Sequence, residues 1–373
     1  MTRVTPGLRY EPVSASPAAL LDGPVEISHT AEARSLVAGR RILVTGGGGS
    51  IGSEIARQLH RLSPESVYLV DHDEGALHAV QLDIHGHGLL DDETIVLGDI
   101  REPAAMHNLM ATVRPHIIFH AAAHKHLPLL ERYPVQGLRT NVLGTANVLR
   151  AAEAAGVERF IFVSTDKAAN PTSVLGLTKR LGEVLTQAHA DSPMRVASVR
   201  FGNVLGSRGS FLQSLAWQVR HDVPITVTSP DVTRFFMTIP QASALVIEAA
   251  VMADKGETYV LDMGAPVRIA ELVERYASMI GAKAPVIRYT GLRPGEKLHE
   301  ELLDENTEQR EPTPSERIWC VRARRPVPAS MFERVYSLQA LVDLNLPTAV
   351  VPSMRGILEE ALDDARSPLA LSA

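Results

Sequence analysis

The chain contains 373 residues, of which 21% are charged, and its formal net charge is −6. This length accommodates one large α/β domain with a smaller satellite, and it is sufficient to bury a core without disulfide bonds. The Lys and Arg residues are dispersed, which argues against a nucleic-acid partner, and the single Cys320 favours a reducing, cytoplasmic setting.

Residues 1–38 predict an extended N-terminal arm. They are rich in Pro, Ser and Ala, show little periodicity and lack the apolar region of a signal peptide. Residues 41–45 then form a short apolar run with β-branched side chains, which indicates a buried strand. A glycine-rich turn follows, and a helical pattern continues through Leu59.

The glycine-rich turn fits two overlapping dinucleotide-binding patterns. Gly-x-x-Gly-x-x-Gly begins at Gly46, and Gly-x-Gly-x-x-Gly begins at Gly47. Such glycines let the backbone approach a pyrophosphate at the N-terminus of a helix. The predicted cofactor-binding residues of this turn are Gly46, Gly49, Ser50, Ile51 and Gly52.

The second predicted strand, residues 67–70, ends in Asp71, which lies 19 residues beyond Gly52. A carboxylate at this position accepts hydrogen bonds from the adenosine ribose and repels a 2′-phosphate. We therefore expect NAD as the cofactor, while His72 or a nearby Arg leaves NADP as an alternative.

Strands and helices continue to alternate up to residue 202. Apolar runs predict buried parallel strands at 94–97, 116–119, 159–163 and 195–199. Helical patterns lie between them, near 104–113, 135–155 and 178–188. This alternation predicts an α/β fold with a doubly wound parallel sheet in residues 39–202, and elements near 241–262 are expected to return to it.

Four predicted strands end in segments that could bind ligands: Asp99, Ala121–Ala123, Ser164–Lys167 and Phe201–Asn203. Because ligands of doubly wound sheets bind at the carboxyl ends of the strands, these segments should converge.

The helix after residue 167 carries Lys179 one turn beyond Leu175, on the same face. Nicotinamide enzymes with this layout usually have a tyrosine where this chain has Leu175, and leucine cannot transfer a proton. Thr165, Asp166 and Lys167 must therefore carry more of the acid–base chemistry, or the protein performs none.

Beyond Asn203 the alternation loosens and prolines separate short elements, which predicts a smaller, mixed, mainly substrate-binding domain over residues 203–325. Its clearest helix covers 270–280. The apolar stretch 244–253 contains Glu248 and is too short to cross a bilayer, so no membrane span is expected. Residues 326–373 form a C-terminal tail to which the sequence assigns no role.

Together these segments resemble the extended short-chain dehydrogenase/reductase superfamily, which has a Rossmann sheet. Within it they are most similar to the polysaccharide-biosynthesis branch, whose nucleotide-sugar 4,6-dehydratases act on UDP-N-acetylglucosamine. The resemblance runs from about Leu20 to Arg324 and rests on the motifs at 44–54, 98–101, 121–128, 140–145, 164–171, 200–207 and 292–297. Long members carry membrane helices before the catalytic part, and this chain resembles a soluble form.

The resemblance implies a hydro-lyase reaction on a UDP-sugar. The sugar is oxidised at C4 by hydride transfer, loses the C5 proton and the C6 hydroxyl, and regains the hydride at C6. Lys179 would orient the nicotinamide ribose, Asp166 would protonate the departing hydroxyl, and Lys167 would take the C5 proton. A base role predicts that burial or a nearby cation lowers the pKa of Lys167. The acceptor of the C4 proton stays open between Thr165, Asp166 through water, and Lys167.

The same resemblance implies the remaining binding residues. The cofactor site would also include Asp99, Ile100, Ala121, Ala122, Ala123 and Asn141. The sugar would contact Lys125 and His126, and the diphosphate clamp would comprise Asn203, Ser207, Arg208, Arg234, Arg293 and Glu296. No metal site is expected, because no Cys or carboxylate completes a set with His120, His124 and His126. We expect a homo-oligomer.

Two other functions stay open. A UDP-sugar 5,6-dehydratase, or a C4 or C5 epimerase, would keep the oxidation and change the later steps. A non-catalytic dinucleotide-binding scaffold would need only the glycine turn and the clamp. This chain also retains Thr165, Asp166, Lys167 and Lys179, which argues against the scaffold.

Overall fold

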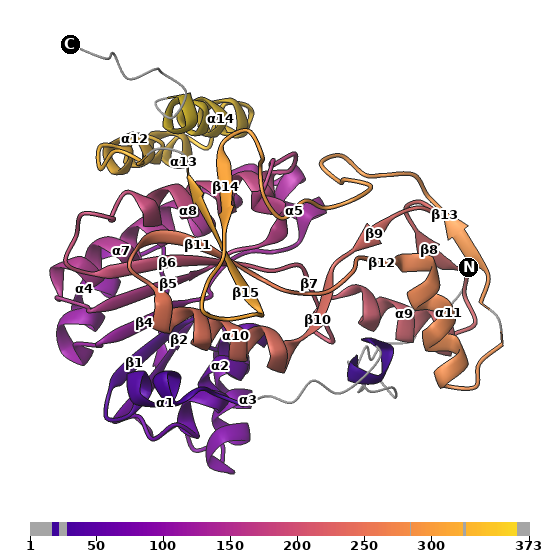
Figure 1. The fold of residues 1–373 in the computed structure, drawn as a ribbon, viewed down its shortest axis with the longest axis horizontal. Coiled ribbons are helices and arrows are strands. Elements are labelled where there is room, and N and C mark those ends of the chain that lie inside the picture. Colours follow the sequence, from indigo (N-terminus) through magenta and orange to yellow (C-terminus); the bar gives the residue numbers. More distant parts are fainter. Residues whose placement is uncertain (1–16, 22–27, 284, 324–325, 364–373) are drawn as a thin grey trace.

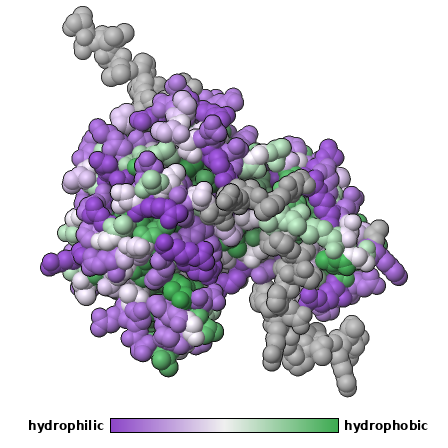
Figure 2. All heavy atoms as spheres, turned by 60° about the horizontal axis from the view of Figure 1, so that its bottom comes forward, coloured by the Kyte–Doolittle hydropathy of each residue, from purple (hydrophilic) through white to green (hydrophobic). Residues whose placement is uncertain are grey.

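The computed structural model describes residues 17–21, 28–283, 285–323 and 326–363. A large lobe is built around one sheet (Figure 1). A smaller lobe lies to one side of it, beyond the short strands β7 (Asn203–Leu205) and β10 (Phe236–Thr238). Figure 2 shows a face on which hydrophilic residues predominate and hydrophobic residues gather in separate patches. Among the described helices, none has both the length and the apolar composition needed to cross a bilayer.

The large lobe contains a nine-stranded sheet in the order β14-β15-β11-β6-β5-β4-β1-β2-β3. The strands are β1 (Arg41–Thr45), β2 (Ser66–Asp71), β3 (Ile95–Leu97), β4 (Ile117–His120), β5 (Arg159–Val163), β6 (Arg195–Arg200), β11 (Lys255–Leu261), β14 (Glu308–Glu311) and β15 (Ile318–Ala323). Neighbouring strands from β3 to β11 are parallel, and β15 and β14 are added antiparallel. The order of the first six strands is that of dinucleotide-binding sheets, which confirms the predicted fold.

Helices cover both faces of this sheet. One face packs mainly against α4 (Pro103–Val113), α5 (Leu127–Arg132), α6 (Pro134–Gly137), η2 (Leu138–Leu143), α7 (Gly144–Ala154) and α8 (Val174–Gln187). The other face packs against α1 (Ala31–Val37), α2 (Ser50–His60), α3 (Glu74–His85) and α10 (Ile239–Met252). The strands are buried on both sides, which explains their continuous apolar runs.

The smaller lobe contains three two-stranded sheets and two helices. β7 (Asn203–Leu205) pairs with β10 (Phe236–Thr238), β8 (Ile225–Val227) with β13 (Ile287–Tyr289), and β9 (Thr233–Arg234) with β12 (Val267–Arg268). The helices α9 (Phe211–Arg220) and α11 (Ile269–Met279) share a separate apolar core with these strands. Helix α11 matches the helix predicted at 270–280 within one residue.

The prediction of an extended arm over residues 1–38 is wrong at η1 (Pro17–Leu21) and α1, which are helical, while residues 1–16 and 22–27 lie outside the described part. The side chain of Thr30 caps α1 by accepting a hydrogen bond from the amide of Ala33. Its hydroxyl also donates to Glu248 of α10 over 2.6 Å. The composition of residues 1–38 as a whole concealed this short helix, although Thr30 is a typical N-cap residue.

The C-terminal tail has a structural role that the sequence did not indicate. It forms α12 (Met331–Tyr336), α13 (Gln339–Asp343) and α14 (Pro347–Asp363), and these helices pack over α6, η2, α7 and α8. Val335, Val350 and Met354 are fully buried in the resulting cluster. The tail thus adds a further layer to one helical face of the large lobe.

Candidate active site

The glycine turn leads directly from β1 into α2 and leaves no room for side chains. Gly46 has a positive φ of 68°, and a Cβ on it would lie 2.6 Å from the backbone nitrogen of Ala122. A Cβ on Gly52 would lie 2.2 Å from the carbonyl oxygen of Gly46. Gly49 occupies the N-cap of α2 without a side-chain cap, so the first amides of the helix face an open cradle. This cradle fits the pyrophosphate of a dinucleotide.

Substituting Gly52 with alanine is expected to abolish measurable dinucleotide binding and to lower stability by about 1–3 kcal/mol, because the new methyl group would push the turn open. A fluorescence titration with NAD and a urea unfolding curve would measure both effects. Gly75 in α3 offers a control, because a Cβ there would be 3.5 Å from its nearest neighbour, Asp73. If Gly52→Ala bound NAD as well as Gly75→Ala does, the assignment of the cradle would be contradicted.

The carboxylate of Asp71 lies at the end of β2, next to the glycine turn. Its Oδ2 accepts a hydrogen bond from the amide of Gly48 over 3.0 Å, and its Oδ1 accepts one from the amide of Asp73 over 3.1 Å. The neighbouring cavity of about 110 Å³ is lined by predicted cofactor residues: Gly46, Gly49, Asp71, Asp99, Ile100, Ala121, Ala122 and Ala123. It has the position expected for the adenosine half of a dinucleotide.

Asn141 was predicted to bind the cofactor, but it lines neither this cavity nor the larger one described next. It is buried in the π-helical segment η2. Its Oδ1 accepts a hydrogen bond from the amide of His124 over 2.8 Å, and its Nδ2 donates to the carbonyl of His124 over 3.0 Å. Asn141 therefore fixes the loop after β4, which carries other site residues.

A cavity of about 610 Å³ lies between the glycine turn and the smaller lobe. Three of the four predicted strand-end segments, those after β4, β5 and β6, meet at it together with α8. The fourth, Asp99 after β3, lines the smaller cavity instead. The predicted residues that line it are Gly49, Ser50, Ile51, Gly52, Asp71, Ala121, Ala123, Lys125, His126, Thr165, Leu175, Lys179, Asn203, Ser207 and Arg208. The sequence prediction missed its wall at the start of α9, where Ser210, Phe211 and Leu212 line the cavity.

Lys179 and Leu175 both lie on the face of α8 that lines the cavity. The ammonium of Lys179 donates a hydrogen bond to the carbonyl of Val163 over 2.8 Å and lies 4.6 Å from the ring centroid of Phe162. Burial lowers the pKa of Lys179 to about 8. Lys179 is thus a buried cation at neutral pH, as a residue that orients a nicotinamide ribose should be.

Thr165, Asp166 and Lys167 form a hydrogen-bonded chain behind the cavity wall. Thr165 lines the cavity, and its hydroxyl donates to Oδ1 of Asp166 over 2.9 Å. The Lys167 ammonium donates to the same oxygen over 2.9 Å. Asp166 is completely buried, and its Oδ2 has no hydrogen-bond partner among the described residues. An unpartnered buried carboxylate oxygen is costly and is typical of a functional site.

The expectation of a lowered pKa for Lys167 is wrong. Burial alone would lower the pKa, but the carboxylates of Asp166 and Glu300 outweigh it, and the pKa of Lys167 lies above its ordinary value. Lys167 is therefore an ammonium in the resting protein.

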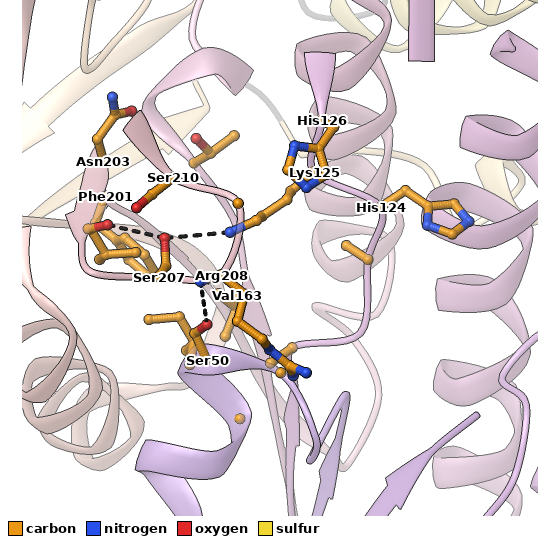
Figure 3. A pocket seen from close by; sticks show the side chains of 18 of the residues that line it. Ser50, His124, Lys125, His126, Val163, Phe201, Asn203, Ser207, Arg208 and Ser210 are labelled. Atoms are coloured by element: carbon orange, nitrogen blue, oxygen red, sulfur yellow. Dashed lines mark hydrogen bonds between the residues drawn. The ribbon is translucent and has the colours of Figure 1, made fainter. Parts of the chain in front are cut away.

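The cavity is also lined by Lys125, Ser207 and Arg208, which have different partners. Lys125 donates a hydrogen bond to the Ser207 hydroxyl over 3.3 Å (Figure 3). The amide of Arg208 donates to the Ser50 hydroxyl over 3.1 Å, and its guanidinium donates to the carbonyl of Gly48. Arg208 thus lies against the cofactor cradle, although the sequence placed it in the substrate clamp.

Of the other predicted clamp residues, Asn203 lines the cavity, whereas Arg234, Arg293 and Glu296 do not. The guanidinium of Arg234 donates to the carbonyls of Thr233, Lys297 and Leu298 over 2.7–3.2 Å and so holds the 297–298 backbone. Arg293 and Glu296 pair with each other over 2.6 Å near the surface. In this structure these residues hold the backbone and side chains of the 293–298 loop in place.

A buried ionic cluster lies next to the segment Thr165–Lys167, which we call the catalytic strip. It consists of Arg180, Glu183, Arg200 and Glu308, which belong to α8, β6 and β14. Glu183 also accepts a hydrogen bond from the Ser164 hydroxyl over 2.7 Å, directly before Thr165. The cluster therefore links the end of β5 to the hairpin formed by β14 and β15.

His120 is separated from the cavity. It is fully buried between Thr45, over 2.6 Å, and Thr145, over 2.9 Å. Burial lowers its pKa to about 3, so the ring is neutral and belongs to the core.

The sheet order and the side-chain-free glycine cradle define a dinucleotide-binding α/β protein, and with the lysine on α8 they agree with the resemblance to extended short-chain dehydrogenases/reductases. The chain belongs to the polysaccharide biosynthesis protein family, whose model matches residues 42–323. This confirms the family expected from the motifs.

Relatives and solved structures agree with this assignment. The chain is 42% identical over 284 residues to the probable polysaccharide biosynthesis protein EpsC of Bacillus subtilis, covering 74% of this chain and 47% of that protein. It is 31% identical to a UDP-glucose 4-epimerase of Rickettsia bellii, covering 71% and 77%. The crystal structure of Pen from Bacillus thuringiensis has a TM-score of 0.69 at 31% identity, covering 77% and 89%. The chain spans about half the length of EpsC.

Proposed function

We propose that the protein is an NAD-dependent 4,6-dehydratase that converts UDP-N-acetylglucosamine into a 4-keto-6-deoxy sugar. The observation that carries the proposal is the hydrogen-bonded chain that runs from Thr165, at the cavity wall, through Asp166 to Lys167 behind it. Lys179 lines the same cavity, and Leu175 stands in the place of the usual tyrosine. Membership of a polysaccharide biosynthesis family supports a nucleotide-sugar substrate.

The glycine cradle, Asp71 and Lys179 would hold NAD, which supplies a hydride acceptor for C4 of the sugar and a hydride donor for C6. Asp71 would accept hydrogen bonds from the adenosine ribose and repel the phosphate of NADP. Lys179 would donate hydrogen bonds to the nicotinamide ribose from its buried position on α8. On the sugar side, Lys125, His126, Asn203 and Ser207 would contact the UDP-sugar.

The geometry suggests an acceptor for the C4 hydroxyl proton. Thr165 is the member of the chain that lines the cavity, and its hydroxyl already donates to Asp166. The C4 proton would pass to Thr165 while the Thr165 proton moves to Asp166. Asp166 would then protonate the departing C6 hydroxyl, so one proton serves both steps. Lys167 would remove the C5 proton and return it after the hydride reaches C6.

NMR of the product formed from UDP-N-acetylglucosamine would test the proposal. The expected product shows a C6 methyl doublet and a C4 ketone or its hydrate, and clear turnover without these signals would refute it. A C4 epimerase is the second candidate, favoured by the 31% identity to the Rickettsia enzyme, and it would retain the C6 hydroxymethyl signals. A 5,6-dehydratase would give alkene signals. The homo-oligomer and the cytoplasmic location stay predictions.

Leu175→Met is expected to retain turnover within about threefold, because it keeps the apolar volume and the proposed proton route needs no hydroxyl at this position. Steady-state kinetics with the same sugar would measure it. A loss of more than about a hundredfold, in a variant that still binds NAD, would show that Leu175 has a role beyond filling space.

A further inference from the structure

Glu300 is a buried carboxylate that neither the sequence motifs nor the proposed reaction uses. Its side chain is 4% exposed, and its Oε1 lies 3.7 Å from Nζ of Lys167 and 3.7 Å from Nε of Arg234. The next residue, Glu301, is 52% exposed and pairs with Lys297 over 3.0 Å. Of these two adjacent carboxylates, that of Glu300 is buried beside Lys167, and that of Glu301 is half exposed to solvent.

Among the described residues, the ammonium of Lys167 donates two hydrogen bonds, so its third N–H group has no acceptor within hydrogen-bond distance. An ammonium carries three N–H groups. Asp166 Oδ1 accepts one over 2.9 Å and Asn203 Oδ1 accepts another over 3.2 Å. The remaining carboxylate within ion-pair distance of Lys167, among the described residues, is that of Glu300.

The proposed reaction requires a neutral Lys167, whereas the resting residue is charged. Asp166 cannot take the surplus proton, because it must receive the proton of the C4 hydroxyl. Arg234 cannot act as a proton acceptor, and its guanidinium already donates to backbone carbonyls.

We propose that Glu300 is the positioning residue that accepts the surplus proton of Lys167 and so makes its amine a base. This inference rests on the proposed function. The ammonium of Lys167 and the carboxylate of Glu300 become an amine and a carboxylic acid, with no change in net charge. The amine then takes the C5 proton and later returns it to C5, after which Glu300 gives its proton back to Lys167.

The surroundings of Glu300 suit this transfer. Burial raises its pKa, and the nearby carboxylate of Asp166 adds to that effect. The cations Lys167, Arg234 and Lys297 oppose it without overcoming it. Burial disfavours the charged form of both partners, so it favours the neutral pair of amine and carboxylic acid. The two groups lie 3.7 Å apart, and such contacts tighten when a substrate closes the site.

The test compares the full-length wild type with Glu300→Gln and Glu301→Gln, using UDP-N-acetylglucosamine and NAD between about pH 7 and about pH 9.5. Glutamine cannot accept a proton, so Lys167 must lose its proton to solvent. The turnover of Glu300→Gln relative to wild type should fall at least about tenfold at pH 7 and recover about tenfold per pH unit. Glu301→Gln should match wild type throughout, because this half-exposed side chain does not pair with Lys167 and the amide oxygen of glutamine can still accept the hydrogen bonds from Asn170 and Lys297.

A second readout separates a proton-transfer role from a general disturbance of the site. In deuterium oxide, Glu300→Gln should slow deuterium incorporation at C5 and leave the C4 oxidation rate, followed by reduced-cofactor absorbance, close to that of wild type. A relative turnover that does not change with pH, or an equal loss in both steps, would overturn the inference. A wild type that forms no 4-keto product would instead refute the proposed function.

Discussion

Asp166→Asn is expected to lower turnover of UDP-N-acetylglucosamine by about 10²- to 10⁴-fold. Asparagine has nearly the same shape, and its amide oxygen can still accept hydrogen bonds from Thr165 and Lys167, as Oδ1 of Asp166 does. The amide cannot hold the proton that leaves the C4 hydroxyl. The first oxidation therefore stalls, and rapid-mixing absorbance should detect no reduced cofactor.

Lys167→Met provides the comparison, because Lys167 acts after the oxidation. In this variant the C4 hydroxyl proton can still reach Asp166, but the C5 proton cannot be removed. Reduced cofactor should accumulate while no 4-keto-6-deoxy product forms. Both variants should bind NAD with unchanged affinity, which verifies the fold. If Asp166→Asn accumulated reduced cofactor as Lys167→Met does, the route through Thr165 to Asp166 would be wrong.

Arg200→Met is expected to lower the free energy of unfolding by about 3–5 kcal/mol. Arg200 is fully buried and pairs with Glu183 and with Glu308, each over 2.6 Å. Methionine would leave Arg180 as the one cation that pairs with these carboxylates among the described residues. Urea unfolding would measure the loss, and Arg40→Met is the control.

Arg40 pairs with Glu158 over 3.0 Å at the surface, where the two side chains are 40% and 55% exposed, so its loss should cost at most about 1 kcal/mol. A comparable loss in the two variants would contradict the account of the cluster. Burial opposes the ionised form of Glu308, but Arg180 and Arg200 lower its pKa from 4.5 to about 2. Its stabilising contribution is therefore complete above pH 4.5 and is lost as the pH falls toward 2.

Local sequence signals were sufficient to predict the parts of the protein that depend on neighbouring residues. The run 41–45 followed by glycines defined β1 and the cofactor cradle, and Asp71 and Lys179 lie where the strand and helix periodicities placed them. These features depend on alternation, turn chemistry and helix spacing, which a single sequence displays directly.

The features that the sequence could not predict depend on contacts between distant segments. Glu308 reaches Arg200 only because β14 and β15 extend the sheet beside β11. The guanidinium of Arg234 is a typical phosphate-binding group, yet it donates hydrogen bonds to backbone carbonyls of a loop more than 60 residues later. The pKa of Lys167 is raised by the neighbouring Asp166 and also by Glu300, whose proximity no motif indicated.

The most direct test of the proposed reaction follows the hydrogen on C4. UDP-N-acetylglucosamine carrying deuterium at C4 would be incubated with the protein and NAD, and the product analysed by NMR and mass spectrometry. The proposed 4,6-dehydratase moves the label from C4 to the C6 methyl group, because hydride removed at C4 returns at C6. Label that returns to C4, as in an epimerase or a 5,6-dehydratase, would contradict the proposal.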